Sequence, residues 1–408
     1  LNLHDGYPDD ATVQKIYDNL DASRALQAYL LALPFVNQAG MRESIRRFGP
    51  DNQTNFITEN LADSRTVTLT PNDDTVYNWM WLDTHKGPLV IEAPPKILGL
   101  VDDFWYNWIG DVGITGAAKG QGGKYLVLPP DYSGEVPPGY LTYRSRTYGV
   151  FVFWRGFFKD PKQLEAPVAV MEQTRIYPLG KQATAKAMEF PNASKTPVNM
   201  LYPTDGSPFD MLSRFIDHEY VDPQDMEMRG MLAALGIVKG KPFKPEPATR
   251  DLLDKAAKTA SKIGHAISYT PQTIVADGTW YPDRKWLNVF PGNATFTADT
   301  FNYIEPRTGF FTNAYSASPG MAVNMENVGA KYPATFVDAK GQFLSGSNNY
   351  SLNLPDGIPA ALFWSVTAYD SITASGLDNG QPFPSLNTMD KPFTNGDKAW
   401  KPGDLMKQ

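Results

Sequence analysis

The 408-residue sequence contains no cysteine and only four histidines. Without cysteine, disulfide bonds, thiolate metal sites and a cysteine nucleophile are all excluded. His4, His85, His218 and His265 are far apart, and Glu219 after His218 is not followed by the second histidine of a zinc-protease helix. We therefore expect no multi-histidine metal centre. No G-x-S-x-G elbow occurs either, although a serine triad built from distant segments stays open.

The sequence also lacks a basic segment and a long apolar one. A net charge of −7 without any Lys/Arg run argues against nucleic-acid binding, so no nucleic-acid partner is expected. No apolar run approaches the roughly 18 residues that span a bilayer. The first residue is Leu1 rather than Met, which a removed signal peptide or a trimmed start would both explain. We expect a periplasmic or secreted protein, although the absence of cysteine fits the cytosol equally well.

Aromatic residues, proline and glycine are plentiful. An aromatic content of 12%, with 34 prolines and 33 glycines, is typical of many strands and turns. The length favours two domains. We predict a mainly β fold with helical segments (α+β), in which two β-sandwich or jelly-roll-like modules are joined by a helical region. The proline-rich segment 239–247 separates the predicted domains, 1–238 and 248–408.

Helical periodicity occurs near the N-terminus and in the middle of the chain. Asp9 or Asp10 can cap a helix that Pro34 should end or kink. Further helices are predicted at 161–175 and within 205–267. Strands are predicted at 66–69, 88–94, 124–130, 139–158 and 361–370, and a hairpin turn at 338–341.

The segment TPNDDTVYNWMWLD (70–83) combines a turn with an aromatic strand. Alternation places Tyr77, Trp79 and Trp81 on one face of this strand, and Met80 and Leu82 on the other. The aromatic face has two interpretations. It is either packed in the core, which is the commoner outcome, or it is a stacking platform for a sugar or another flat ligand.

Several segments resemble a known family. TPNDDTVYNWMWLD, GPLVIEAP and DDFWYNW resemble the N-terminal module of a bacterial domain-of-unknown-function family numbered 1254, and ALGIVKGKPFKP resembles the close of that module. YPATFVDAKGQFLSGSNNYSLNLPDGIPAALFWSVTAYD resembles its C-terminal partner module, numbered 1214. The resemblance implies a two-part, β-rich and often exported protein without established chemistry. The family usually continues through further strands after PSLNTMDKPFTNG, so a missing segment or a shortened member is expected near Gly396 and Asp397.

Two pairs of adjacent carboxylates precede aromatic strands. Asp73 and Asp74 would point to opposite faces of a strand, so turn and capping roles are favoured over a shared-proton pair. Asp102 and Asp103 precede aromatic residues in the same way. A rim of four carboxylates could bind Ca²⁺ or Mg²⁺, but the spacing of a calcium loop is absent. We therefore predict no cofactor and no metal.

An aromatic wall rimmed by Asp, Asn and Arg predicts a concave site for a small organic or glycan-like molecule. Arg146 could hold an anion, although a solvated or ion-paired side chain is the commoner role, and Arg155 would add a stacking cation if it shares the cavity. The predicted ligand-binding residues are Asn72, Tyr77, Trp105, Asn107, Arg146 and Trp364.

The predicted site has a binding version and a hydrolytic version. For hydrolysis, Asp74 or Asp103 would be the base and Tyr369 the acid. The alternative is a non-catalytic, envelope-associated structural or interaction protein whose aromatic residues are core. Open sheet edges can also pair between copies, so a homo-oligomer is an expectation that no motif fixes.

Overall fold

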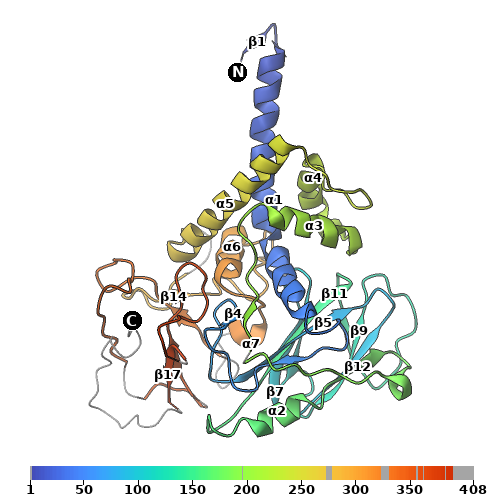
Figure 1. Ribbon diagram of the computed structural model, residues 1–408, viewed down its shortest axis with the longest axis vertical. Coiled ribbons are helices and arrows are strands. Elements are labelled where there is room, and N and C mark those ends of the chain that lie inside the picture. Colours follow the sequence, from blue (N-terminus) through green and yellow to red (C-terminus); the bar gives the residue numbers. More distant parts are fainter. Residues whose placement is uncertain are drawn as a thin grey trace.

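The computed structural model describes residues 2–194, 196–272, 278–322, 330–354, 357–361, 363–381 and 383–388. It has the mixed α+β fold that the sequence predicts. A two-sheet sandwich lies at one end, helices cover it, and the last third of the chain forms short strands beside it (Figure 1). Within these residues, no helix combines the length and hydrophobicity needed to cross a bilayer.

The long helix α1 (Asp10–Arg46) organises the fold. Its N-terminal half projects from the body and carries the small hairpin of β1 (Leu3–His4) and β2 (Tyr7–Pro8), whereas its C-terminal half is buried (Figure 1). The predicted cap is confirmed, because Asp9 Oδ1 accepts a hydrogen bond from the Thr12 N–H at 2.7 Å.

Pro34 does not end this helix, because α1 continues for a further twelve residues to Arg46. The alternative, a kink at Pro34, stays a prediction. Proline removes one helical hydrogen bond. Nearly every residue around Pro34 is buried against other helices and the sheet, so tertiary packing outweighs that loss.

The sandwich joins two sheets. In the five-stranded sheet the strand order is β3 (Phe56–Ile57), β5 (Val76–Asp83), β11 (Gly149–Gly156), β7 (Ile97–Asp103) and β8 (Trp108–Gly113). In the four-stranded sheet it is β10 (Leu141–Arg144), β9 (Gly123–Leu128), β6 (Leu89–Ala93) and β12 (Arg175–Pro178). Apolar side chains such as Met80, Val152 and Val127 fill the space between the sheets.

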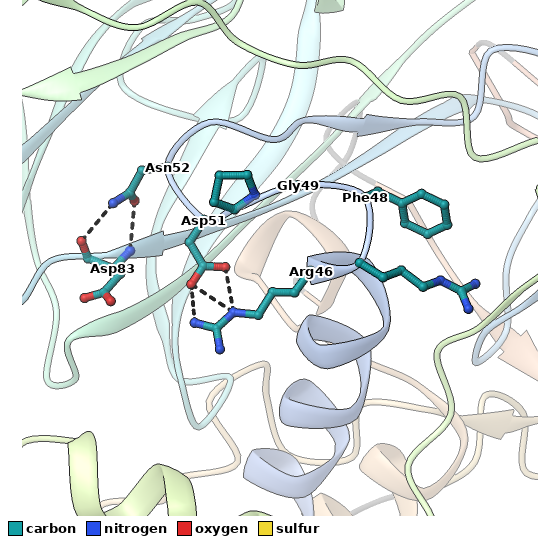
Figure 2. Close-up of a pocket in the computed structure, with 8 residues that line it drawn as sticks. Arg46, Phe48, Gly49, Asp51, Asn52 and Asp83 are labelled. Atoms are coloured by element: carbon teal, nitrogen blue, oxygen red, sulfur yellow. Dashed lines mark hydrogen bonds and ion pairs between the residues drawn. The ribbon is translucent and has the colours of Figure 1, made fainter.

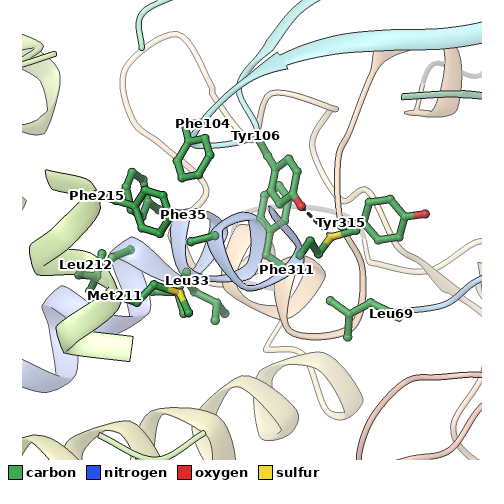
Figure 3. Close-up of a cluster of buried hydrophobic side chains, with 14 of the residues drawn as sticks. Leu33, Phe35, Leu69, Phe104, Tyr106, Met211, Leu212, Phe215, Phe311 and Tyr315 are labelled. Carbon is green, nitrogen blue, oxygen red and sulfur yellow. Dashed lines mark hydrogen bonds between the residues drawn. The ribbon is translucent and has the colours of Figure 1, made fainter. Parts of the chain in front are cut away.

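The second face of the five-stranded sheet is aromatic, as the alternation predicts. Trp79 and Trp81 of β5 pair across the ladder with Phe153 and Phe151 of β11. These rings belong to the core cluster that also contains side chains of α1 and α6 (Figure 3). Most of this face therefore lies in a dry core between sheet and helices.

The remaining helices are α2 (Glu165–Met171), α3 (Ser207–His218), α4 (Met226–Ala234), α5 (Pro247–Tyr269), α6 (Ile304–Asn313) and α7 (Pro319–Ala322), with 3-10 turns η1 (Gln182–Thr184) and η2 (Pro223–Asp225). Helices α3, α4, α5 and α6 contact α1, whereas α2 contacts β5 and β11. Helix α2 is shorter than the predicted 161–175, because Arg175 already begins β12. Segment 239–247 connects α4 to α5, and one buried cluster holds residues from both sides of it.

Short strand pairs complete the described chain. They are β4 (Thr66–Val67) with β13 (Val198–Asn199), β14 (Leu287–Asn288) with β15 (Pro333–Ala334), and β16 (Ser365–Thr367) with β17 (Ser385–Asn387). The predicted turn at 338–341 is confirmed, since the Asp338 N–H donates to the Gln342 carbonyl and Gly341 has φ +80°. The jelly-roll-like arrangement of the C-terminal module stays a prediction. Gly396 and Asp397 lie outside the described residues.

Candidate functional site

A large cavity separates one end of the five-stranded sheet from the C-terminal segments, and we call it the inter-module cavity. Its volume is about 2340 Å³. Tyr77, Phe153 and Arg155 line it from the sheet, and Trp364 and Tyr369 line it from the C-terminal segments. Side chains from both halves of the chain therefore face one hollow.

Strand register brings the sheet residues of this wall together. Arg155 of β11 lies directly opposite Tyr77 of β5, and Phe153 lies two residues earlier on the same face. The rings of Tyr77 and Phe153 are 5.2 Å apart between centroids. Burial raises the pKa of Tyr77, so its hydroxyl stays protonated and can donate a hydrogen bond.

Arg155 is the most unusual residue of the wall. Its side chain is buried, yet it forms no ion pair with a carboxylate among the described residues. Within the same residues, its one side-chain hydrogen bond runs from Nη2 to the Tyr332 hydroxyl, at 3.1 Å. Burying a cation is costly unless an anion compensates for the lost hydration.

Tyr369 and Trp364 belong to the strand segment that faces the sheet. Burial is the main cause that raises the pKa of Tyr369, and the nearby Tyr77 adds to it. Tyr369 is therefore a neutral hydroxyl donor at physiological pH. Trp364 stands just before β16 and presents its ring to the cavity wall.

Asn72, Asp73 and Asp74 form the turn that precedes β5. Asn72 lines the cavity, and its Oδ1 accepts a hydrogen bond from the Asp74 N–H at 3.1 Å, as expected for a turn residue. Asp73 accepts hydrogen bonds from Ser385 Oγ at 2.6 and 2.5 Å. Asp74 Oδ1 accepts one from Asn387 Nδ2 at 2.6 Å. Both carboxylates thus fasten β17 to the N-terminal module, and neither lines the cavity.

Asp103 lies elsewhere, at the end of β7, and Trp105 and Asn107 follow it in the loop to β8. The Asp103 carboxylate accepts hydrogen bonds from the Trp105 and Asn107 backbone and from Asn107 Nδ2, at 2.7–2.9 Å. Burial outweighs these bonds and raises the pKa of Asp103 to about 6. The Trp105 ring packs on Phe35 of α1, with 4.5 Å between centroids. This loop supports the helical core and does not line the cavity.

Arg146 also lies apart from the cavity. Its Nε donates to Asp222 at 3.0 Å and its Nη2 to Asp225 at 3.3 Å, so it is ion-paired with the segment around η2. Besides the exposed Arg284, Arg155 is the described arginine that lines the cavity. The sequence signal for it was the pattern Phe151, Phe153, Arg155, in which a cation continues the face of a fully buried strand.

A second, shallower pocket lies at the C-terminal end of α1 and has a volume of about 640 Å³. Its charged and polar groups already pair with one another. Arg46 binds Asp51, and Asn52 exchanges hydrogen bonds with the backbone of Asp83 (Figure 2). It is the weaker candidate. In the described part of the chain, no group of three metal-ligating side chains comes together.

Fold and cavity together define a two-part α+β protein with a hollow large enough for a small ligand. Residues 52–178 match the family model described as a protein of unknown function (DUF1254), and residues 329–401 match that of a second protein of unknown function (DUF1214). The two matches follow one another in the order N-terminal module, then C-terminal module, as in the two-part family that the sequence resembles.

Two solved structures are similar to this chain. The VPA0106 protein from Vibrio parahaemolyticus has 17% sequence identity and a TM-score of 0.55, over 88% of this chain and 82% of that chain. An uncharacterized protein from Burkholderia cenocepacia has 12% identity and a TM-score of 0.35, over 93% of this chain and 82% of that chain. The similarity to the Vibrio parahaemolyticus structure supports the fold. No curated protein matches the chain.

Proposed function

We propose that this protein binds a small organic molecule in the inter-module cavity. The observation that carries the proposal is a hollow of about 2340 Å³ whose wall combines aromatic rings with a few polar groups. Ligand sites typically have this composition and occupy about 300–1,000 Å³. The cavity is larger, so a ligand of drug size would fill only part of it.

The alternative, an envelope-associated structural protein whose aromatic residues are all core, fits only part of the aromatic strand. Trp79 and Trp81 are core residues. Tyr77 contacts the same core but also lines the cavity, as do Trp364 and Tyr369. This division supports binding over a purely structural role.

Hydrolysis receives less support than binding. The hydrolytic version would combine a carboxylate base with Tyr369 as acid and Arg146 as anion holder. Asp103 and Arg146 lie away from the cavity, and Asp74 holds Asn387 at its margin. We therefore propose binding alone. The exported location that the sequence suggests stays a prediction.

A binding screen tests the proposal directly. The full chain would be screened by thermal shift and then by calorimetry against indole and naphthalene derivatives, organic acids and disaccharides. We expect at least one class to bind, and Trp364→Ala to weaken that binding. Trp108→Ala is the matched control, because Trp108 is half-exposed on β8 and does not line the cavity. Absence of binding across the whole panel would contradict the proposal.

A further inference from the structure

We propose that Arg155 and the Tyr332 hydroxyl form a carboxylate-binding subsite at the sheet end of the inter-module cavity. The ligand would then be an organic carboxylate with an apolar body. This inference rests on the proposed function and adds to it the chemical class of the ligand.

The charge of the buried Arg155 side chain is the first observation that points to a bound anion. Two described arginines are buried, Arg42 and Arg155, and they are 4% and 8% exposed. Arg42 binds the Asp51 carboxylate through Nε and Nη2, at 3.1 and 2.5 Å. Arg155 contacts no described carboxylate, and its guanidinium faces a cavity instead. The missing counter-charge is what a bound anion would supply.

The neighbouring groups that act on the charge of Arg155 are tyrosines. The Tyr332 hydroxyl accepts its hydrogen bond and keeps a proton to donate, and Tyr77 and Tyr315 lie close enough to act on its charge. Burial raises the pKa of both Tyr77 and Tyr315, so these groups remain neutral donors. A guanidinium beside hydroxyl donors favours the binding of an anion and disfavours the binding of a cation.

Three carboxylates at or beside the cavity are engaged by other groups. Asp73 and Asp74 accept hydrogen bonds from β17, as described above. Asp370, also on the cavity wall, accepts three from the backbone and hydroxyl groups of residues 372–373, at 2.7–3.1 Å. None of them forms an ion pair with Arg155 in the described structure.

The surroundings of Arg155 suit a bound carboxylate better than a bound phosphate. A guanidinium fork matches the two oxygens of a carboxylate, whereas a phosphate dianion carries more charge and often adds a helix N-terminus or further cations. Arg155 is the buried cation at the sheet end, whereas the lysines on the cavity wall (Lys285, Lys331 and Lys340) are partly or fully exposed. The neighbouring wall, which includes Phe153 and Phe310, is apolar and suits an aryl or alkyl body.

Matched acid and amide probes test the subsite. Calorimetry on the full chain would compare 4-phenylbutyrate with 4-phenylbutyramide, and indole-3-acetate with indole-3-acetamide. We expect the acids to bind about 10- to 100-fold more tightly than the amides, as a charge-assisted pair would give. Arg155→Met should abolish this preference, and Arg155→Lys should keep part of it.

Arg175→Met is the matched control, because Arg175 lies on the edge strand β12 of the four-stranded sheet. It should leave the preference intact. If Arg155→Met does not fold, Tyr332→Phe carries the test, since it removes one hydroxyl and should reduce the preference.

The outcomes separate this inference from the proposed function. Equal binding of acid and amide would overturn the carboxylate subsite and leave ligand binding in place. Tighter binding of phenylphosphonate than of any carboxylate would also overturn it. Should these probes and the wider screen all fail to bind, both the subsite and the proposed function would be contradicted.

Discussion

The aromatic face of β5 and β11 has two ends with different surroundings. At one end, Trp81 and Phe151 are buried in the large core cluster that also holds side chains of the helices. At the other end, Tyr77 and Phe153 border the inter-module cavity. The same alternation of residues thus produces core at one end and a candidate site at the other. What covers the strand decides between these roles, and the strand itself does not.

Each of these regions also contains a buried arginine. Arg42 packs over the Phe104 ring at 5.1 Å and binds Asp51. Burial alone would raise the pKa of Asp51, but Arg42 and Arg46 outweigh it and hold that pKa below its ordinary value. Among the described residues, the polar groups that act on Arg155 are tyrosine hydroxyls. One arginine therefore completes the fold, and the other is the one that we propose binds the ligand.

The largest expected difference comes from removing each arginine in turn. Arg42→Met should lower the free energy of unfolding by about 2–3 kcal/mol, because it removes one of the two arginines that bind the buried Asp51 carboxylate and leaves Arg46 as its partner. Arg155→Met should leave the free energy of unfolding unchanged or raise it by about 1 kcal/mol or more, because it removes a buried charge without a counter-ion. Urea unfolding of the ligand-free variants measures both. An equal loss in the two variants would erase the contrast.

Two tryptophans extend the comparison between the core end and the cavity end to aromatic side chains. Trp79 is fully buried and its Nε1 donates to the Tyr315 hydroxyl at 3.2 Å, so Trp79→Ala should cost about 3–5 kcal/mol. Trp364 is only partly buried on the cavity wall, and Trp364→Ala should cost less than about 2 kcal/mol. Thermal and urea unfolding give the two values. A cost for Trp364→Ala as large as that for Trp79→Ala would assign Trp364 to the core.

Asp103 makes the free energy of unfolding depend on pH, and this dependence can be measured. Its pKa rises from 3.8 to about 6 on folding, so the folded state binds its proton more tightly than the unfolded chain. The stability from this group is present below pH 3.8 and is lost as the pH rises through about 6. The loss amounts to about 3 kcal/mol, at about 1.4 kcal/mol per pKa unit.

Comparison with Asp103→Asn isolates this effect. The difference in unfolding free energy between the parent and Asp103→Asn should fall by about 2.4 kcal/mol between pH 4 and pH 7. Asp18→Asn, on the exposed part of α1, serves as the surface control. A pH-independent difference for Asp103→Asn would contradict the assigned burial of this carboxylate.

The smallest effect concerns the attachment of β17. Ser385→Ala removes the hydroxyl that donates to Asp73 and should lower the local opening free energy of β16 by about 1–2 kcal/mol. Hydrogen exchange of the Ser365–Thr367 amides measures this opening, with the exposed Ser347→Ala as control. Unchanged exchange would mean that other contacts hold the C-terminal segments on the sheet.

Local patterns predicted helices α1 to α5 and several strands, but not β7, β8, β12 or α6. The alternation in residues 76–83 and the cap at Asp9 depend on neighbouring residues alone, so both could be read from the sequence. The continuation of α1 through Pro34 could not, because distant helices and the sheet provide the packing that sustains it.

The candidate site was only partly predictable for the same reason. Tyr77, Trp364 and Tyr369 were expected to line one cavity, and they do. Arg146 was preferred as anion holder over Arg155, because sequence cannot show that Asp222, seventy-six residues away, neutralises Arg146. Pairing between distant charges depends on the tertiary fold.

The most direct test of the central claim is a crystal structure with a brominated aryl carboxylate such as 6-bromo-2-naphthoate. The account predicts an anomalous bromine peak inside the inter-module cavity, with the carboxylate of the ligand bound to the Arg155 guanidinium. A peak outside the cavity, or a bound carboxylate that leaves Arg155 untouched, would contradict it.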